Sequence, residues 1–242
     1  MPLALAAIFL SAAPVLIGPF LVVQVGWFAY VPMPEPPVWE SIAWEALSWL
    51  ERVLPALLAA LAIGRPRWLG PLGAPVTAVA LALEILTPVL GTSGALNWPT
   101  IACHAAALAA LVVLWRRPLV TQPPGLAAIA AWAVAYLAVL WPPLANLYPA
   151  IPPSGILAAP GDGIILELTW RNILIETGFF WAAVLPVMVA ACHFTGRRVA
   201  GVLSGLVLLV PAVLCGLSWG ALPYLVAAAL VPLGQLRSGQ PR

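Results

Sequence analysis

The stretch SIAWEALSWLERVLPALLAALAIGRPR, residues 41–67, decides the fold of this chain. Its apolar part, residues 41–63, is long enough to cross the hydrocarbon core of a membrane as a helix, which takes about 20 residues. Arg65 and Arg67 follow at once, and arginine accumulates at the cytoplasmic ends of membrane helices. This stretch therefore predicts a transmembrane helix whose last turn faces the cytoplasm.

The rest of the chain follows the same pattern. Lysine is absent, and arginine clusters separate apolar stretches of one or two spans; the clusters are Arg65/Arg67, Arg116–Arg117, Arg197–Arg198 and Arg237/Arg242. Of the 242 residues, 63% are hydrophobic and 7% are charged. Such a composition cannot supply the charged surface of a soluble domain. We therefore expect an all-α, polytopic transmembrane bundle that forms a single domain over residues 1–242.

Eight spans fit the pattern best. The apolar stretches are residues 3–30, 41–63, 71–90, 99–115, 125–141 and 170–194, followed by two short spans that turn near residues 216–220. The alternative is seven spans, with one long helix after residue 200. We expect the fifth span to stop at Pro142–Pro143, and residues 145–169 to form the main extramembrane loop.

The positions of arginine also predict orientation and location. With eight spans, both termini lie in the cytoplasm, and we expect the protein in the bacterial inner (cell) membrane. A 4+4 internal repeat is a further hypothesis, because Tyr30-Val-Pro-Met-Pro before Glu45 resembles Tyr148-Pro-Ala-Ile-Pro-Pro before Glu167. A bias toward alanine and leucine alone also produces such matches.

Intramembrane carboxylates point to a possible function. With the orientation above, Glu45, Glu84 and Glu176 fall in the outer leaflet, on three different spans. A charge in hydrocarbon costs at least ~2.5 kcal/mol, so we expect these side chains to share a partly hydrated cavity. A carboxyl that keeps its proton there is a candidate general acid. The alternative is that the carboxylates pair with arginine or reach outward as packing, which is our interpretation of Glu51 and Arg171.

Aromatic and polar residues surround the predicted cavity. Most of the 12 tryptophans fall in the same leaflet, where an interfacial belt accounts for many of them. Aromatic faces also attract cations, so they suit a pocket that handles cationic intermediates. The expected substrate-binding residues are Trp44, Trp49, Trp98, His104, Asn172 and Phe180.

No cofactor or metal is expected from the sequence. His104 and His193 each follow a cysteine, but they belong to opposite leaflets and cannot ligate one haem. We interpret both as hydrogen-bonded or interfacial histidines. Cys103, Cys192 and Cys215 lie in apolar runs, where they indicate small buried side chains and no disulfide framework. The arginines are explained by topology, so no nucleic-acid partner is expected.

Two motifs in the first half resemble the integral-membrane terpene cyclases of meroterpenoid and indole-terpenoid pathways. Ile42-Ala43-Trp44-Glu45 is similar to the Trp-Glu motif of that family, and Glu84 followed by Gly94-Ala-Leu-Asn-Trp98-Pro99 is similar to a second family pattern. The resemblance implies cyclisation of a prenyl chain, with Glu45 as the proton donor and Glu84 as a supporting acid. It covers roughly residues 1–100, and the chain lacks the acidic residue that the family carries near its last span.

Three classes of function remain open at this point. The first is an integral-membrane enzyme that acts on a lipid-soluble, isoprenoid substrate. The second is a non-catalytic subunit of a membrane complex that binds quinone or lipid. The third is a transporter, for which a 4+4 repeat would provide the architecture. The expected partners are a lipid-soluble small-molecule substrate and membrane lipid.

Overall fold

The computed structural model describes residues 1–21, 37–91, 96–120, 124–146, 170–196, 198–214 and 222–238. All regular structure within these ranges is helical. The elements in chain order are α1 (Pro2–Leu21), α2 (Val38–Gly64), the short 3-10 helix η1 (Pro66–Trp68), α3 (Leu69–Leu90), α4 (Trp98–Arg116), α5 (Leu126–Asn146), α6 (Trp170–Thr195), α7 (Arg198–Leu214) and α8 (Leu222–Ser238). The prediction of an all-helical chain is confirmed for this part.

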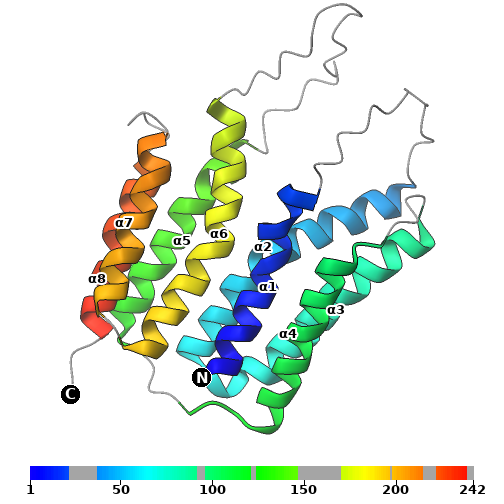
Figure 1. The fold of residues 1–242 in the computed structure, drawn as a ribbon, viewed down its shortest axis with the longest axis horizontal. Coiled ribbons are helices and arrows are strands. Elements are labelled where there is room, and N and C mark those ends of the chain that lie inside the picture. The colour runs from blue at the N-terminus through cyan, green and yellow to red at the C-terminus, as the bar shows by residue number, and fades with distance from the viewer. Residues whose placement is uncertain are drawn as a thin grey trace, which may run out of the picture.

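The α-helices of the described ranges form two neighbouring groups, each with four helices. In the first group α1 packs on α2 and α4, and α3 packs on α2 and α4. In the second group α5 packs on α6 and α8, and α7 packs on α6 and α8. Helix α6 joins the groups, because it also contacts α1 and α2. Figure 1 shows the second group on the left and the first group on the right. Helix α6 is the member of the second group that faces the first.

Successive helices run in opposite directions. The odd-numbered helices α1, α3, α5 and α7 begin at one side of the bundle (Figure 1). The even-numbered helices α2, α4, α6 and α8 finish at that same side. Arg65 and Arg67 lie between α2 and α3, while Arg116 and Arg198 are terminal residues of α4 and α7. These arginines therefore lie at one end of the bundle.

The helix bounds follow most of the predicted spans. Helix α2 begins three positions before residue 41 and ends at Gly64, and α4 ends at Arg116 where the arginine pair predicts its end. The prediction that Pro142–Pro143 stops the fifth helix is wrong, because α5 continues to Asn146. Each proline removes one backbone bond, the one that its own N–H would donate to the residue four positions earlier; the loss of these two bonds does not end the helix, which runs on to Asn146.

Among the described residues, three helical segments are long and apolar enough to cross a membrane, judged by length and composition. They are Val38–Gly64, Pro66–Leu90 and Trp98–Arg116. Shorter apolar helices occur at Pro2–Ile17, Leu126–Trp141, Phe180–Thr195, Gly201–Val213 and Leu222–Gly234. The two predicted elements after residue 197 are present as α7 and α8, and the turn expected near residues 216–220 lies outside the described residues. The same holds for residues 147–169 of the expected loop.

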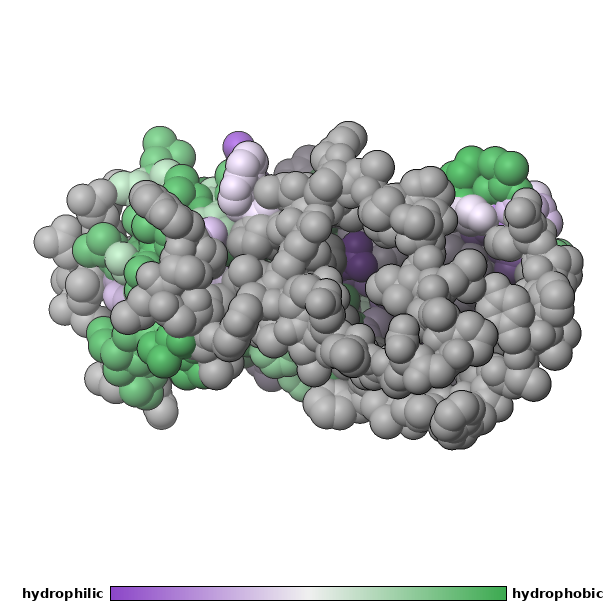
Figure 2. All heavy atoms as spheres, turned by 90° about the horizontal axis from the view of Figure 1, so that it is seen from above, coloured by the Kyte–Doolittle hydropathy of each residue, from purple (hydrophilic) through white to green (hydrophobic). Residues whose placement is uncertain are grey.

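Large apolar side chains cover much of the outside. Phe9, Val79, Leu137, Val210 and Leu233 are each about half exposed. Figure 2, which looks onto the molecule from above, shows hydrophobic residues at several places on the outer edge and hydrophilic residues both near the centre and at the edge. Exposed apolar side chains of this size suit helices in contact with lipid.

Small residues let the helices of the first group approach closely. A Cβ atom added at Gly70 of α3 would lie 2.5 Å from the Cα atom of Trp115 and 2.9 Å from the carbonyl carbon of Leu114. The backbones of α3 and α4 therefore touch near the arginine-bearing end, as small residues permit in membrane helix pairs. This contact fixes α4 against α3 and so sets the positions of the side chains further along both helices.

Candidate functional site

One face of α2 carries the first part of the candidate site. Trp44, Leu47, Ser48 and Glu51 follow the spacing i, i+3, i+4 and i+7, which places them in a stripe along one side of a helix. All four line a pocket of about 200 Å³. The stripe continues the helix's buried side, because Leu47 is 3% exposed and Leu54 is fully buried. Packing of α2 on α1 and α3 therefore carries Glu51 into the bundle.

Helices α3 and α4 contribute a buried carboxylate and a buried imidazole. Glu84 is 4% exposed, and His104 is fully buried. A hydrogen bond of 2.7 Å joins Nδ1 of His104 and Oε2 of Glu84, and the pair forms a salt bridge when the imidazole is protonated. The interpretation of His104 as a hydrogen-bonded histidine is confirmed. The bond connects residues on two helices across the interior of the first group.

Glu51, Glu84 and His104 meet in one cluster. A carboxylate oxygen of each glutamate and a ring nitrogen of His104 all lie within 4.8 Å of one another. The pocket of about 200 Å³ lies beside this cluster, because Glu51 and Glu84 are among its lining residues. Its remaining walls come from Pro14, Pro88, Asn97 and Thr100. The cluster therefore combines three ionisable groups with a space large enough to admit several heavy atoms of a ligand.

Burial determines which charges the cluster tolerates. Two ionised carboxylates at this separation repel each other strongly in a low-dielectric interior. One arrangement avoids this repulsion: an ionised Glu84 pairs with a protonated His104, while Glu51 keeps its proton. The Nε2 atom of His104 is buried and has no hydrogen-bond partner among the described residues. The imidazole is therefore held on one side only, by Glu84.

The donor set of the cluster suits two kinds of chemistry. A protonated glutamate beside a carboxylate–histidine pair is a proton-transfer device. Two carboxylates and one imidazole are also ligands that divalent transition ions accept. No other group of three or more potential ligands of this kind occurs in the described part of the chain.

The structure brings together some of the predicted site residues. Glu84 and His104 are in contact, and Trp44 lines the pocket beside them. Glu45 is exposed on another face of α2, where its Oε1 atom accepts a 2.7 Å hydrogen bond from Nε1 of Trp49. The Glu45–Trp49 pair is therefore separate from the pocket wall. The catalytic role of Glu45 stays a prediction.

Other predicted residues lie elsewhere. Trp98 is 66% exposed at the start of α4. Phe180 is 39% exposed, and its ring packs edge-on against Trp181 at a centroid distance of 5.5 Å. Glu176 and Asn172 belong to the first turns of α6, but their side chains lie outside the described residues, so their predicted roles stay predictions.

Sequence reasoning missed Glu51 as a member of the site. The signal was present in the spacing of Trp44, Leu47, Ser48 and Glu51, which aligns the polar side chains with a buried leucine. Its neighbour Arg52, whose guanidinium lies 5.7 Å from the Trp49 ring centroid, favoured interpretation as a local ion pair. The burial of Glu40 was also not predicted. This side chain is 2% exposed and packs against Gly91 at the end of α3.

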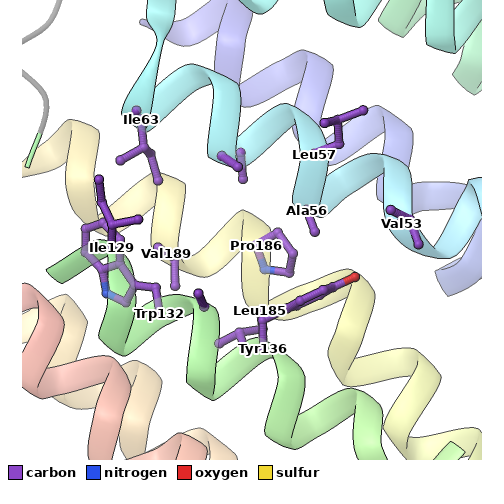
Figure 3. Close-up of a pocket in the computed structure, with 14 residues that line it drawn as sticks. Val53, Ala56, Leu57, Ile63, Ile129, Trp132, Tyr136, Leu185, Pro186 and Val189 are labelled. Carbon is purple, nitrogen blue, oxygen red and sulfur yellow. The ribbon is translucent and has the colours of Figure 1, made fainter. Parts of the chain in front are cut away.

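A second cavity lies between α2, α5 and α6. Its volume is about 340 Å³, and its walls are almost entirely apolar. Figure 3 shows Tyr136 and Trp132 of α5 facing Pro186 and Val189 of α6, with Val53 and other residues of α2 opposite. The Tyr136 hydroxyl lies 3.4 Å from the carbonyl oxygen of Arg52, a long distance for a hydrogen bond between oxygens.

Within the described residues, the cysteines and His193 form no second polar centre. Cys103 and Cys192 are free thiols; Cys192 is buried as predicted, whereas Cys103 is only partly buried, so the prediction is wrong for Cys103. The Cys192 sulfur lies 3.4 Å from the Ser204 hydroxyl. Cys215 lies outside the described residues. The His193 ring packs edge-on between Trp132 and Phe194, at centroid distances of 6.1 Å and 5.5 Å. The two histidines therefore occupy different environments, and only His104 contacts a carboxylate in the described part.

Comparison with known proteins finds no matching family model, no matching curated protein and no matching solved structure. The resemblance to the terpene cyclases therefore rests on the two sequence motifs alone. The geometry of the cluster and of the two cavities bears on function instead.

Proposed function

We propose that this protein is an integral-membrane enzyme that acts on a lipid-soluble, isoprenoid-type substrate by carboxylic acid catalysis. The observation that carries the proposal is the meeting of Glu51, Glu84 and His104 beside a pocket of about 200 Å³. Buried ionisable groups of this kind are costly inside a membrane helix bundle and mark functional sites by default. Cyclisation of a prenyl chain is the sharpest form of the proposal, and the sequence resemblance supports it.

Each residue then has a role. Glu51 lines the pocket and donates its proton to an alkene or epoxide of the substrate. The ionised Glu84, paired with His104, supports the positive charge that develops on carbon, and the indole of Trp44 adds attraction through its π face. Loss of a proton from the product to the Glu51 carboxylate restores the acid. The net reaction is an isomerisation that needs no cofactor.

The test compares two glutamates on the same helix. Glu51→Gln keeps the size of the side chain and removes the proton donor, so we expect turnover to fall by at least ~100-fold, at the lower end of the contribution of a general acid. The protein is purified in mild detergent, and the apolar molecules that copurify are identified by mass spectrometry. An isoprenoid that accumulates in Glu51→Gln and is converted to an isomer by the wild type would establish the reaction.

Glu45→Gln is the matched variant. Glu45 lies six residues before Glu51, is exposed and bonds Trp49, so our proposal expects turnover of this variant within a few-fold of the wild type. The opposite pattern, with activity lost in Glu45→Gln and kept in Glu51→Gln, would return the proton donor to the Trp-Glu motif. Activity in both variants would exclude Glu45 and Glu51 as the proton donor.

The membrane topology belongs to the same proposal. We infer eight spans in a bacterial inner membrane, with both termini in the cytoplasm, because the arginine-bearing helix ends share one end of the bundle. The cluster and its pocket then face the outer leaflet. The 4+4 repeat is supported by the packing order, since the first helix of each group contacts the second and the fourth in both groups. The orientation is tested with single cysteines placed at the helix ends, by measuring from which side of the membrane each cysteine is labelled.

The apolar cavity favours a second candidate function. A space of about 340 Å³ with aliphatic and aromatic walls suits the chain of a quinone or lipid, as expected of a non-catalytic subunit of a membrane complex. This function predicts stable copurification with other chains and insensitivity to Glu51→Gln. A lone, folded chain that converts an isoprenoid would count against it. Ion-dependent uptake of a solute into proteoliposomes would instead indicate a transporter.

A further inference from the structure

We propose that Glu51, Glu84 and His104 form a binding site for one divalent transition cation of the Zn²⁺ or Co²⁺ kind. The three residues come from α2, α3 and α4, so the site depends on tertiary packing and not on local sequence spacing. Each offers one ligand atom, and these atoms lie within 4.8 Å of one another. This site goes beyond the proposed enzyme function and does not require it.

The geometry needs only small movements. Ligand atoms around a tetrahedral zinc ion at its usual N and O distances lie about 3.3 Å apart. The Nδ1 atom of His104 and the Oε2 atom of Glu84 are 2.7 Å apart and must separate by about 0.6 Å on that geometry. Glu51, which is only partly buried and lines the pocket, moves inward. Rotation of two glutamate side chains supplies these shifts without movement of a helix.

The burial and hydrogen bonding of His104 are a second observation that supports a cation site, independent of the spacing of the ligand atoms. The residue is fully buried, and its Nε2 atom has no partner among the described residues. A buried imidazole that serves only as packing usually satisfies both nitrogens. If Nδ1 ligates a cation, its bond to Glu84 is replaced and the ring hydrogen lies on Nε2, for which the described residues offer no acceptor. A buried ring nitrogen left unpaired in this way marks a place where an ion or a water molecule binds beside the imidazole.

Charge and donor type select the cation. Two carboxylates and a dication sum to zero, and a neutral assembly is the least costly one in a low-dielectric interior. Mg²⁺ and Ca²⁺ prefer oxygen ligands alone, whereas imidazole suits Zn²⁺ and Co²⁺. Three protein ligands also leave a fourth position, and the pocket of about 200 Å³ beside Glu51 and Glu84 has room for water there.

The experiment uses the full chain, purified in mild detergent and freed of metal with a chelator. Titration with Co²⁺ is followed by its visible absorption. We expect one Co²⁺ per chain, displaced by Zn²⁺ and not by an equal concentration of Mg²⁺. Because a cation on Glu51 removes the proposed proton donor, Zn²⁺ should also inhibit turnover of a copurified substrate, while the metal-free wild type stays active.

Three variants locate the site. We expect Glu51→Gln and His104→Gln each to weaken Co²⁺ binding by roughly 100-fold or more, because even outer-shell partners of a metal site contribute 10–100-fold. His193→Gln is the control, since its ring packs against Trp132 and Phe194, and we expect it to bind as the wild type does. Unchanged binding in Glu51→Gln, or lost binding in His193→Gln, would overturn the assignment.

A measurement on the wild type covers the case in which variants do not fold. X-ray absorption of the bound Co²⁺ should show a first shell of one imidazole nitrogen and oxygens. A thiolate in that shell would move the site to Cys103 and reject the proposal, and so would the absence of any visible Co²⁺ absorption. Metal binding without turnover would reject the enzyme alone, and turnover without metal binding would reject the cation site alone.

Discussion

The buried Glu84–His104 pair makes a strong prediction about stability. Its side chains are 5% and 0% exposed, and one 2.7 Å bond links them. Replacing His104 by leucine leaves a buried carboxylate without this partner, and breaking a buried pair in this way costs about 3–5 kcal/mol. For a chain of this size, each kcal/mol shifts the melting temperature by about 2–4 °C. We therefore expect His104→Leu to lower the melting temperature by roughly 6–20 °C.

A double-mutant cycle isolates the pair. The variants are Glu84→Leu, His104→Leu and the double replacement, each followed by thermal unfolding in the same detergent. An apolar replacement of both partners is often neutral or stabilising, so the double variant should lie close to the wild type and well above both single variants. Additive losses in the cycle would refute the reasoning, because they would show that the two side chains contribute independently. A loss below about 1 kcal/mol in either single variant would also contradict it.

Three further predictions use unfolding of the purified protein as the measurement. Gly70→Ala forces a methyl group against the backbone at Trp115 and should cost about 1–3 kcal/mol, whereas Gly64→Ala, with nothing within 4 Å of the new atom, should change stability by less than about 1 kcal/mol. Leu58→Ala removes a fully buried side chain and should cost about 2–5 kcal/mol; an unchanged melting temperature would mean that α2 is not packed as described. Trp49→Phe loses one exposed hydrogen bond to a carboxylate and should cost less than about 1.5 kcal/mol, so a larger loss would show that this pair is structurally essential.

Much of the fold could be predicted because it depends on patterns that are local in sequence. The end of α2 is predicted by the apolar stretch up to Gly64 and by the arginines after it. The end of α4 is predicted in the same way by Arg116–Arg117. The extension of α5 through Pro142–Pro143 could not be predicted from the rule that proline ends a helix. Each proline removes only the backbone bond of its own N–H group, and the sequence does not show whether the helix continues past that loss.

The candidate site was only partly predictable. The sequence predicted that Glu84 is an intramembrane carboxylate and that His104 is a hydrogen-bonded or interfacial side chain. It could not show that they bond each other, because their partnership depends on how α3 packs against α4. The choice between Glu45 and Glu51 depends on which face of α2 turns inward. Residues six apart on a helix lie on different faces, and only packing against α1 and α3 decides which of them is buried.

The division of the helices into two groups has a consequence for biosynthesis. All pocket residues beside the cluster, from Pro14 to Thr100, and the three cluster residues precede α5 in the chain. A chain made from its N-terminus folds its first units first, so the polar groups that are costly in lipid find their partners while the second half is still on the ribosome. Helix α6 later packs on α1 and α2. We therefore expect the cluster to assemble during synthesis and the second group of helices to pack against it afterwards.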